Sequence, residues 1–246
     1  MALMRTSNPA LGGDAFRATG AGYGEPMTIS GAVNKTGILL ICAVATSIWS
    51  WNRFLDSPQT ALPLLAIGGI GGFIVALVTI FKKEWSPMTA PLYALLEGLV
   101  MGSVSAMYEM RLHGIVIQAV GLTFGVLFAL LLAYRSGLIR ATENFKLGIV
   151  AATGGIALFY LVQFALGFFG IHFAAVNGSG TIGIGFSLFV VVIAALNLVL
   201  DFDFIERGAE ARAPKYMEWY AAFGLMVTLI WLYLEMLRLL SKTRRR

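Results

Sequence analysis

Long apolar runs dominate the chain from residue 36 onward, and short polar or basic connections separate them. A hydrocarbon core about 30 Å thick needs roughly 20 helical residues at 1.5 Å each. Seven stretches meet or approach this length: 36–52, 60–81, 88–108, 112–134, 147–169, 181–200 and 217–240. Their apolar positions are continuous rather than alternating, which argues against barrel strands. The pattern therefore predicts an all-α membrane protein, a bundle of seven transmembrane helices.

Composition supports lipid as the main solvent of the chain. Hydrophobic residues make up 58% of the sequence and charged residues only 13%, whereas roughly a quarter of an ordinary globular domain is charged. The net charge of +5 resides in the connections, without a basic face interleaved with aromatics, so no nucleic-acid partner is expected. No nucleophile, base and orienting group form a recognisable set, so we expect neither an enzyme nor a cofactor.

The first 35 residues differ from the rest, because they are rich in Gly, Ser, Thr and Asn. We expect a flexible cytoplasmic arm over residues 1–35 and a transmembrane domain over 36–246. Basic residues mark the cytoplasmic side of membrane proteins, and alternate connections hold most of them here: Arg5, Arg17, Lys35, Lys82, Lys83, Arg135, Arg140, Lys146, Arg207, Arg212 and Lys215. A cytoplasmic N-terminus is therefore predicted.

The C-terminal tail "RLLSKTRRR" conflicts with this orientation, because seven crossings place it on the outer side. Either the tail departs from the positive-inside rule, or the seventh segment does not cross completely. The seventh segment is long enough to span, so seven crossings are expected.

Acidic residues gather where the sixth apolar run ends, in the stretch "LVLDFDFIERGAE". A short loop separates Asp201 and Asp203 from Glu218 at the start of the seventh run. Two carboxylates in one partly dry site cannot both ionise easily, so such a pair holds a proton near neutral pH. Calcium could replace that proton, because it prefers hard oxygen ligands. The alternative is a hydrated acidic loop balanced by nearby basic side chains.

Two polar residues lie well inside apolar runs. Glu97 is near the middle of the third run, with Tyr93 four residues earlier on the same helical face. Asn197 shares a face of the sixth helix with Asp201. Charged groups deep in a membrane are candidates for function, but an interhelical hydrogen bond explains either residue as well.

Small residues predict how closely the helices pack. Glycine pairs spaced by three residues allow helix backbones to approach each other. Three such pairs occur, Gly68 with Gly72, Gly98 with Gly102, and Gly121 with Gly125.

Four segments together resemble the transmembrane Bax inhibitor motif family, specifically its bacterial YccA-like branch. They are "MTISGAVNKTG", "LYALLEGLVMGSVS", "DFDFIE" and "APKYMEWYAAFGLMVTLIWLYLEMLRLL". Their order and spacing cover most of the chain from about residue 27. The resemblance implies seven helices with the last one central. It also implies a pH-sensitive calcium leak in the bacterial inner membrane, governed by carboxylates at the cytoplasmic ends of helices six and seven.

The family's helix-six carboxylate corresponds here to Asp201 or Asp203, since one residue of slip fits either. The helix-seven carboxylate corresponds to Glu218, where many relatives carry Asp, so the spacing of the pair could differ. The leading hypothesis is thus a passive, proton-gated leak of a cation, with calcium as the expected ion. The alternative is a non-conducting membrane interaction or stress-regulatory protein.

Overall fold

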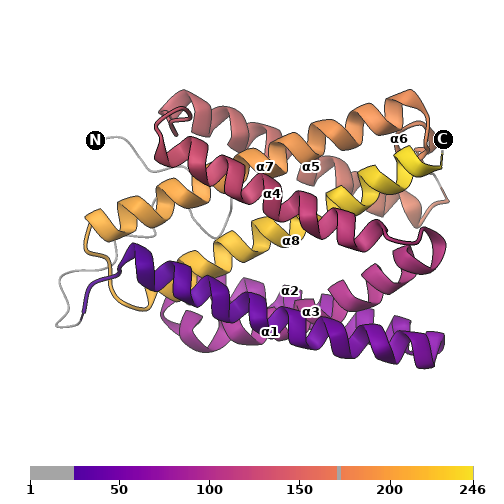
Figure 1. Ribbon diagram of the computed structural model, residues 1–246, viewed down its shortest axis with the longest axis horizontal. Coiled ribbons are helices and arrows are strands. Elements are labelled where there is room, and N and C mark those ends of the chain that lie inside the picture. Colours follow the sequence, from indigo (N-terminus) through magenta and orange to yellow (C-terminus); the bar gives the residue numbers. More distant parts are fainter. Residues whose placement is uncertain (1–24, 171–172, 246) are drawn as a thin grey trace.

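The computed structural model describes residues 25–170 and 173–245 (Figure 1). Over these residues the regular elements are helices, and the single β pairing is an isolated bridge between Pro26 and Pro214. In chain order they are α1 (Ile29–Asp56), η2 (Pro58–Thr60), α2 (Ala61–Phe81), η3 (Lys83–Trp85), α3 (Ser86–Arg111), α4 (Ile115–Arg135), α5 (Glu143–Gly167), α6 (Ala174–Asn177), α7 (Thr181–Glu210) and α8 (Met217–Arg244).

The predicted all-α class is confirmed, and seven of the described helices are long and apolar enough to cross a membrane. Large apolar side chains cover their outward surfaces, for example Ile41 on α1, Ile70 on α2, Ile117 on α4 and Phe164 on α5. Such an extensive apolar exterior fits a lipid environment. The chain is therefore an integral, multi-pass membrane protein.

The first helix begins seven residues earlier than the sequence predicted, at Ile29 rather than at residue 36. Thr28 is its N-cap, and the Thr28 side chain accepts a hydrogen bond of 2.9 Å from the Gly31 amide. Hydropathy could not reveal this start, because the first turns contain polar and small residues. Residues 1–24 of the predicted arm lie outside the described residues.

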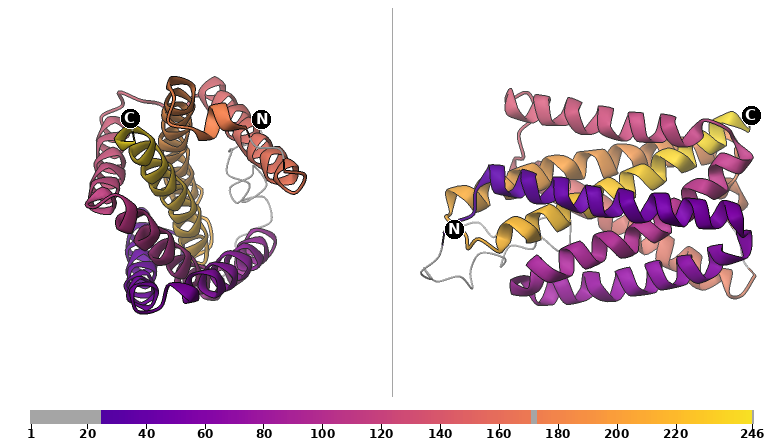
Figure 2. Two further views of the ribbon diagram at one scale, coloured as in Figure 1. Left: turned by 90° about the vertical axis from the view of Figure 1, so that its right-hand side faces the viewer. Right: turned by 60° about the horizontal axis from the view of Figure 1, so that its bottom comes forward.

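The long helices run along one axis, so the bundle has two ends (Figures 1 and 2). The loop end holds the start of α1 and the α7–α8 connection at residues 211–216, and the tail end holds the end of α8. With 28 residues, α8 is about 42 Å long, so it reaches the end opposite to its start. The length and apolar composition of α8 are thus sufficient for a complete seventh crossing, and the outer-side position of the basic tail stays a prediction.

Four helices pack against α8, namely α1, α3, α4 and α7. In the end-on view of Figure 2, α8 in yellow lies among these neighbours. The strongest helix pairing is between α1 and α3.

Two of the three predicted glycine pairs pack as expected. A Cβ added to Gly98 would lie 1.9 Å from Thr46 Oγ1, and one added to Gly68 would lie 2.6 Å from the Leu96 carbonyl oxygen. The prediction for the third pair is wrong, because no described atom lies within 4 Å of a Cβ built at Gly121 or Gly125. Both glycines are exposed on α4.

Candidate functional site at the loop end

Glu218 is the most completely buried carboxyl group at the loop end, with 0% exposure in the first turn of α8. Its Oε1 accepts two hydrogen bonds of 3.0 Å from Thr28, one from the backbone amide and one from the hydroxyl. Its Oε2 is buried and has no hydrogen-bond partner within the described part of the chain. The carboxyl group therefore joins the start of α8 to the start of α1.

A glycine in α1 makes room for this carboxyl group. A Cβ at Gly31 would lie only 2.0 Å from Glu218 Oε1 and 2.1 Å from Cδ. The carboxylate thus occupies the space above the first turn of α1, where the helix dipole and free backbone amides favour negative charge. We call Thr28, Gly31 and Glu218 the α1–α8 latch.

Lys215 adds a positive charge beside the latch. Its Nζ lies 3.3 Å from Glu218 Oε1 and 3.4 Å from the Glu25 carboxylate. The hydrogen bond with Glu218 raises the pKa of Lys215 above its ordinary value. Lys215 is solvent-exposed and Glu218 is not, so this ion pair lies at the boundary between the buried site and the loop-end solution.

Asp203 has partners other than Glu218. Its Oδ2 lies 2.7 Å from the Nζ of Lys146, a buried lysine of α5, and 3.0 Å from Nε of Arg207. Glu143 completes the group at 3.5 Å from Lys146. The sequence left open whether Asp201 or Asp203 is the helix-six carboxylate. Asp203 is engaged in an ion-pair network between α5 and α7. The pairing with Arg207 also agrees with the alternative, in which nearby basic side chains balance the acids.

Asp201 and Asn197 are buried on α7, with exposures of 1% and 3%. The Asn197 amide donates 2.8 Å hydrogen bonds to Thr153 Oγ1 of α5 and to the Ile193 carbonyl oxygen. Asn197 therefore forms an interhelical hydrogen bond, which was one of the two interpretations of this residue from the sequence. Asp201 lies one turn farther along α7 and is buried at the same end of the bundle as Glu218.

The described residues contain no group of three His, Cys, Asp or Glu side chains placed to hold a metal ion. The predicted calcium ligands Asp201, Asp203 and Glu218 therefore do not form one three-carboxylate site, because Asp203 faces Lys146 and Glu218 faces α1. A bound calcium would have to be held by fewer protein carboxylates and by water.

Glu97 lies between α3 and α2. Its side chain interacts with the Tyr93 hydroxyl on the same helix, and its Oε1 would be 2.9 Å from a Cβ at Gly72 of α2. The predicted neighbour Tyr93 is therefore in place, and the glycine of α2 provides the space for the carboxyl group.

A second buried polar group, at the tail end, was not selected from the sequence. Glu235 is 2% exposed, and its Oε1 accepts hydrogen bonds of 3.0 Å from Tyr160 and 2.8 Å from Arg238. Nearby, the buried Lys242 donates to the carbonyl oxygens of Val176 and Gly183 and to Ser187. Two charged residues, Glu235 and Arg238, three positions apart in an apolar run could have indicated this group. The sequence did not indicate that its partners lie on α5 and α6.

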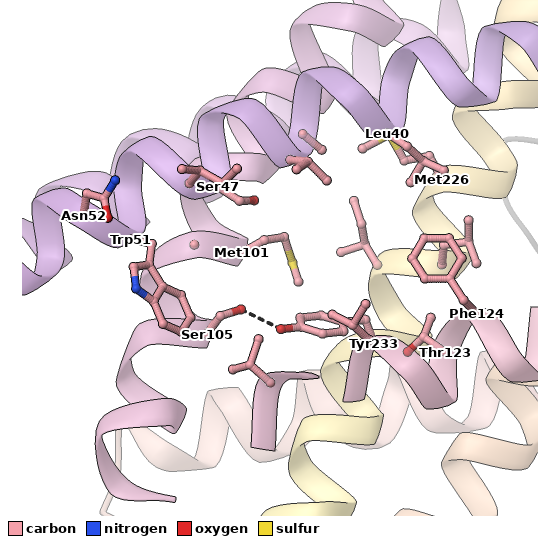
Figure 3. A pocket seen from close by; sticks show the side chains of 18 residues that line it. Leu40, Ser47, Trp51, Asn52, Met101, Ser105, Thr123, Phe124, Met226 and Tyr233 are labelled. Atoms are coloured by element: carbon pink, nitrogen blue, oxygen red, sulfur yellow. Dashed lines mark hydrogen bonds between the residues drawn. The ribbon is translucent and has the colours of Figure 1, made fainter. Parts of the chain in front are cut away.

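A cleft runs between α1 and α4 over α8. Its tail-end cavity, shown in Figure 3, has a volume of about 550 Å³. Ser105 and Tyr233 hydrogen-bond at 2.7 Å in its wall, and Trp51 and Asn52 lie at its far end. The loop-end cavity has a volume of about 990 Å³ and shares Leu40 and Phe124 with the first. Most of the lining of both is apolar.

Comparison with known proteins identifies the family. A search of curated proteins and a search of solved structures each returned no match. The sequence model of the family described as Bax inhibitor 1 like matches residues 8–245, nearly the whole chain. The chain, with seven candidate membrane-spanning helices and buried acidic residues near the α7–α8 junction, therefore belongs to the Bax inhibitor 1 like family.

Proposed function

We propose that the protein is a passive, pH-sensitive leak for a cation, with calcium as the expected ion, gated at the loop end by the α1–α8 latch. In this proposal α8 is the central helix of the bundle, and Asp201 and Glu218 are the carboxyl pair that holds a proton or meets the ion. Membership of the YccA-like branch, a bacterial inner membrane and a cytoplasmic loop end belong to the same proposal.

One observation carries the proposal, the burial of Glu218 with only one of its two oxygens hydrogen-bonded. A buried carboxylate oxygen without a partner is costly, and a proton or a cation removes that cost. The exposed Lys215, 3.3 Å away, lies between this carboxylate and water. The site is therefore placed to respond to the pH of the loop-end solution.

The geometry also supports a direction for the response. Thr28 and the first turn of α1 bind Glu218 best as an anion, because hydrogen bonds to charged groups are about twice as strong as neutral ones. Protonation removes that charge, and with it the attraction of Lys215. Acid therefore weakens the link between α1 and α8. Because α1 forms one wall of the cleft, we propose that the leak rises as the pH falls.

Calcium fits the chemistry of the acidic residues, since it prefers oxygen ligands and tolerates irregular coordination. Asp201 lies inside the same end of the bundle as Glu218. With Asp203 neutralised by Lys146 and Arg207, Asp201 and Glu218 supply the negative charge for a passing ion.

A second candidate function is a membrane interaction protein that conducts nothing. The apolar lining of the cleft favours it, as does the concentration of positive charge at the tail end, where Arg111, Arg238, Lys242 and Arg245 line one pocket. We do not expect enzymatic activity for either candidate.

Calcium flux into liposomes tests the proposal. We compare wild type with Glu218→Gln, which imitates the protonated acid, and with Glu210→Gln, which removes an exposed acid at the same end. Wild type and Glu210→Gln should leak more in acid than at about pH 8, whereas Glu218→Gln should leak under both conditions. No flux above that of empty liposomes at either pH would favour the non-conducting alternative.

A further inference from the structure

We propose that the loop-end cavity binds one acyl chain of an anionic phospholipid, whose phosphate rests on Arg135 and Arg140. This inference concerns a binding site and does not rest on ion conduction. The cavity has a volume of about 990 Å³ and lies between α1, α4 and α7. Its walls are mainly aliphatic and aromatic side chains, including Val33, Leu127, Leu131 and Phe202.

The length of the cavity matches one leaflet. Along α1 its lining extends from Ile29 to Leu40, which is about 17 Å at 1.5 Å per residue. Half of a hydrocarbon core is about 15 Å. The tail-end cavity continues from Leu40 to Asn52, a further distance of about 18 Å. Each cavity thus has the depth of a single acyl chain, and the loop-end cavity belongs to the leaflet of the loop end.

Positive charge lies where the headgroup of such a lipid would be. Arg135 ends α4, and Arg140 lies in the connection to α5; both line the cavity, and both are exposed. Neither forms an ion pair with any residue that the structure describes. Guanidinium groups present paired donors that suit phosphate oxygens. Two such groups at the mouth of an apolar cavity therefore complement a lipid phosphate.

The acidic residues of the lining cancel this charge only in part. Asp203 is ion-paired with Lys146 and Arg207. Glu206 accepts a hydrogen bond from the neutral Tyr134 hydroxyl and keeps its negative charge. Among the described lining residues, two arginines therefore outweigh one carboxylate. This asymmetry favours a lipid with net negative charge over a zwitterionic one.

Native mass spectrometry with two lipids of identical acyl chains tests the site. Wild-type protein is offered phosphatidylglycerol and phosphatidylcholine in equal amounts. We expect phosphatidylglycerol to be retained about tenfold more, which corresponds to about 1.4 kcal/mol. The two arginines contribute about 1 kcal/mol each, and the Glu206 carboxylate offsets part of that sum. Arg135→Gln with Arg140→Gln should lose this preference while still binding both lipids equally, which also shows that the variant is folded.

Two further variants make the test specific. Lys82→Gln with Arg212→Gln removes the same charge from exposed positions at the same end but outside the cavity, and it should keep the preference. Val33→Trp fills the cavity from α1 and should reduce retention of both lipids. Equal loss of preference in the Lys82 and Arg212 control would show general surface attraction and overturn the proposal. Unchanged selectivity in the Arg135 and Arg140 variant would overturn it as well.

Discussion

Replacing Gly31 by alanine tests the α1–α8 latch without removing any polar group. The new Cβ would lie 2.0 Å from Glu218 Oε1, so the carboxyl group must leave its position above α1. Two hydrogen bonds from Thr28 to a charged acceptor are then lost, each with a contribution of about 1.5–3 kcal/mol. Alanine returns at most about 1 kcal/mol through its better helix propensity. We expect a net loss of stability of about 2–5 kcal/mol.

Gly37→Ala is the matched control, because it lies on the same helix and nothing is within 4 Å of a Cβ there. This variant should be equal to wild type or more stable by up to about 1 kcal/mol. Thermal unfolding of both variants in one detergent gives the comparison, and calcium flux at about pH 8 shows whether Gly31→Ala opens the leak as Glu218→Gln does. If Gly31→Ala were as stable as Gly37→Ala, the latch as described here would be refuted.

Three further variants test other parts of the bundle. Lys146→Met should destabilise the protein by about 3 kcal/mol, because it leaves the partly buried Asp203 carboxylate with Arg207 alone. Adding Asp203→Asn should restore much of the stability in thermal unfolding. Gly98→Ala should cost about 1–3 kcal/mol through contact with Thr46, whereas Gly121→Ala should be tolerated by the same measurement. Glu97→Gln should preserve folding, judged by gel filtration and unfolding, and calcium flux decides whether the carboxyl group has a further role.

The number and order of the helices were predictable because each apolar run has the length of a membrane crossing. The start of α1 was not, since it depends on the cap at Thr28 and on Glu218, which is 190 residues away in the sequence. Hydropathy measures local composition and contains no information on such a contact. The same limit applies to Gly121 and Gly125, whose spacing suits close packing although both are exposed and no described atom lies within 4 Å of a Cβ built there.

The candidate site was predictable only in part. Sequence reasoning selected Glu218 and the two aspartates, because acids at the end of an apolar run are unusual. It could not separate Asp201 from Asp203, since that choice depends on the rotation of α7 and on the position of Lys146 in α5. The segment containing Thr28 and Gly31 supported the family resemblance, but its contact with Glu218 required the packing of α1 against α8.

Movement of α1 on acidification tests the central claim most directly. Spin labels at Asn34 of α1 and Ala211 of the α7–α8 connection, both exposed, allow the distance to be measured by pulsed electron spin resonance in lipid after replacement of Cys42 by serine. The latch predicts one narrow distance distribution at about pH 8 and a longer or broader one in acid, with Glu218→Gln giving the second distribution under both conditions. Distributions that do not change with pH, or that change equally in Glu218→Gln, would contradict a gate built on Glu218.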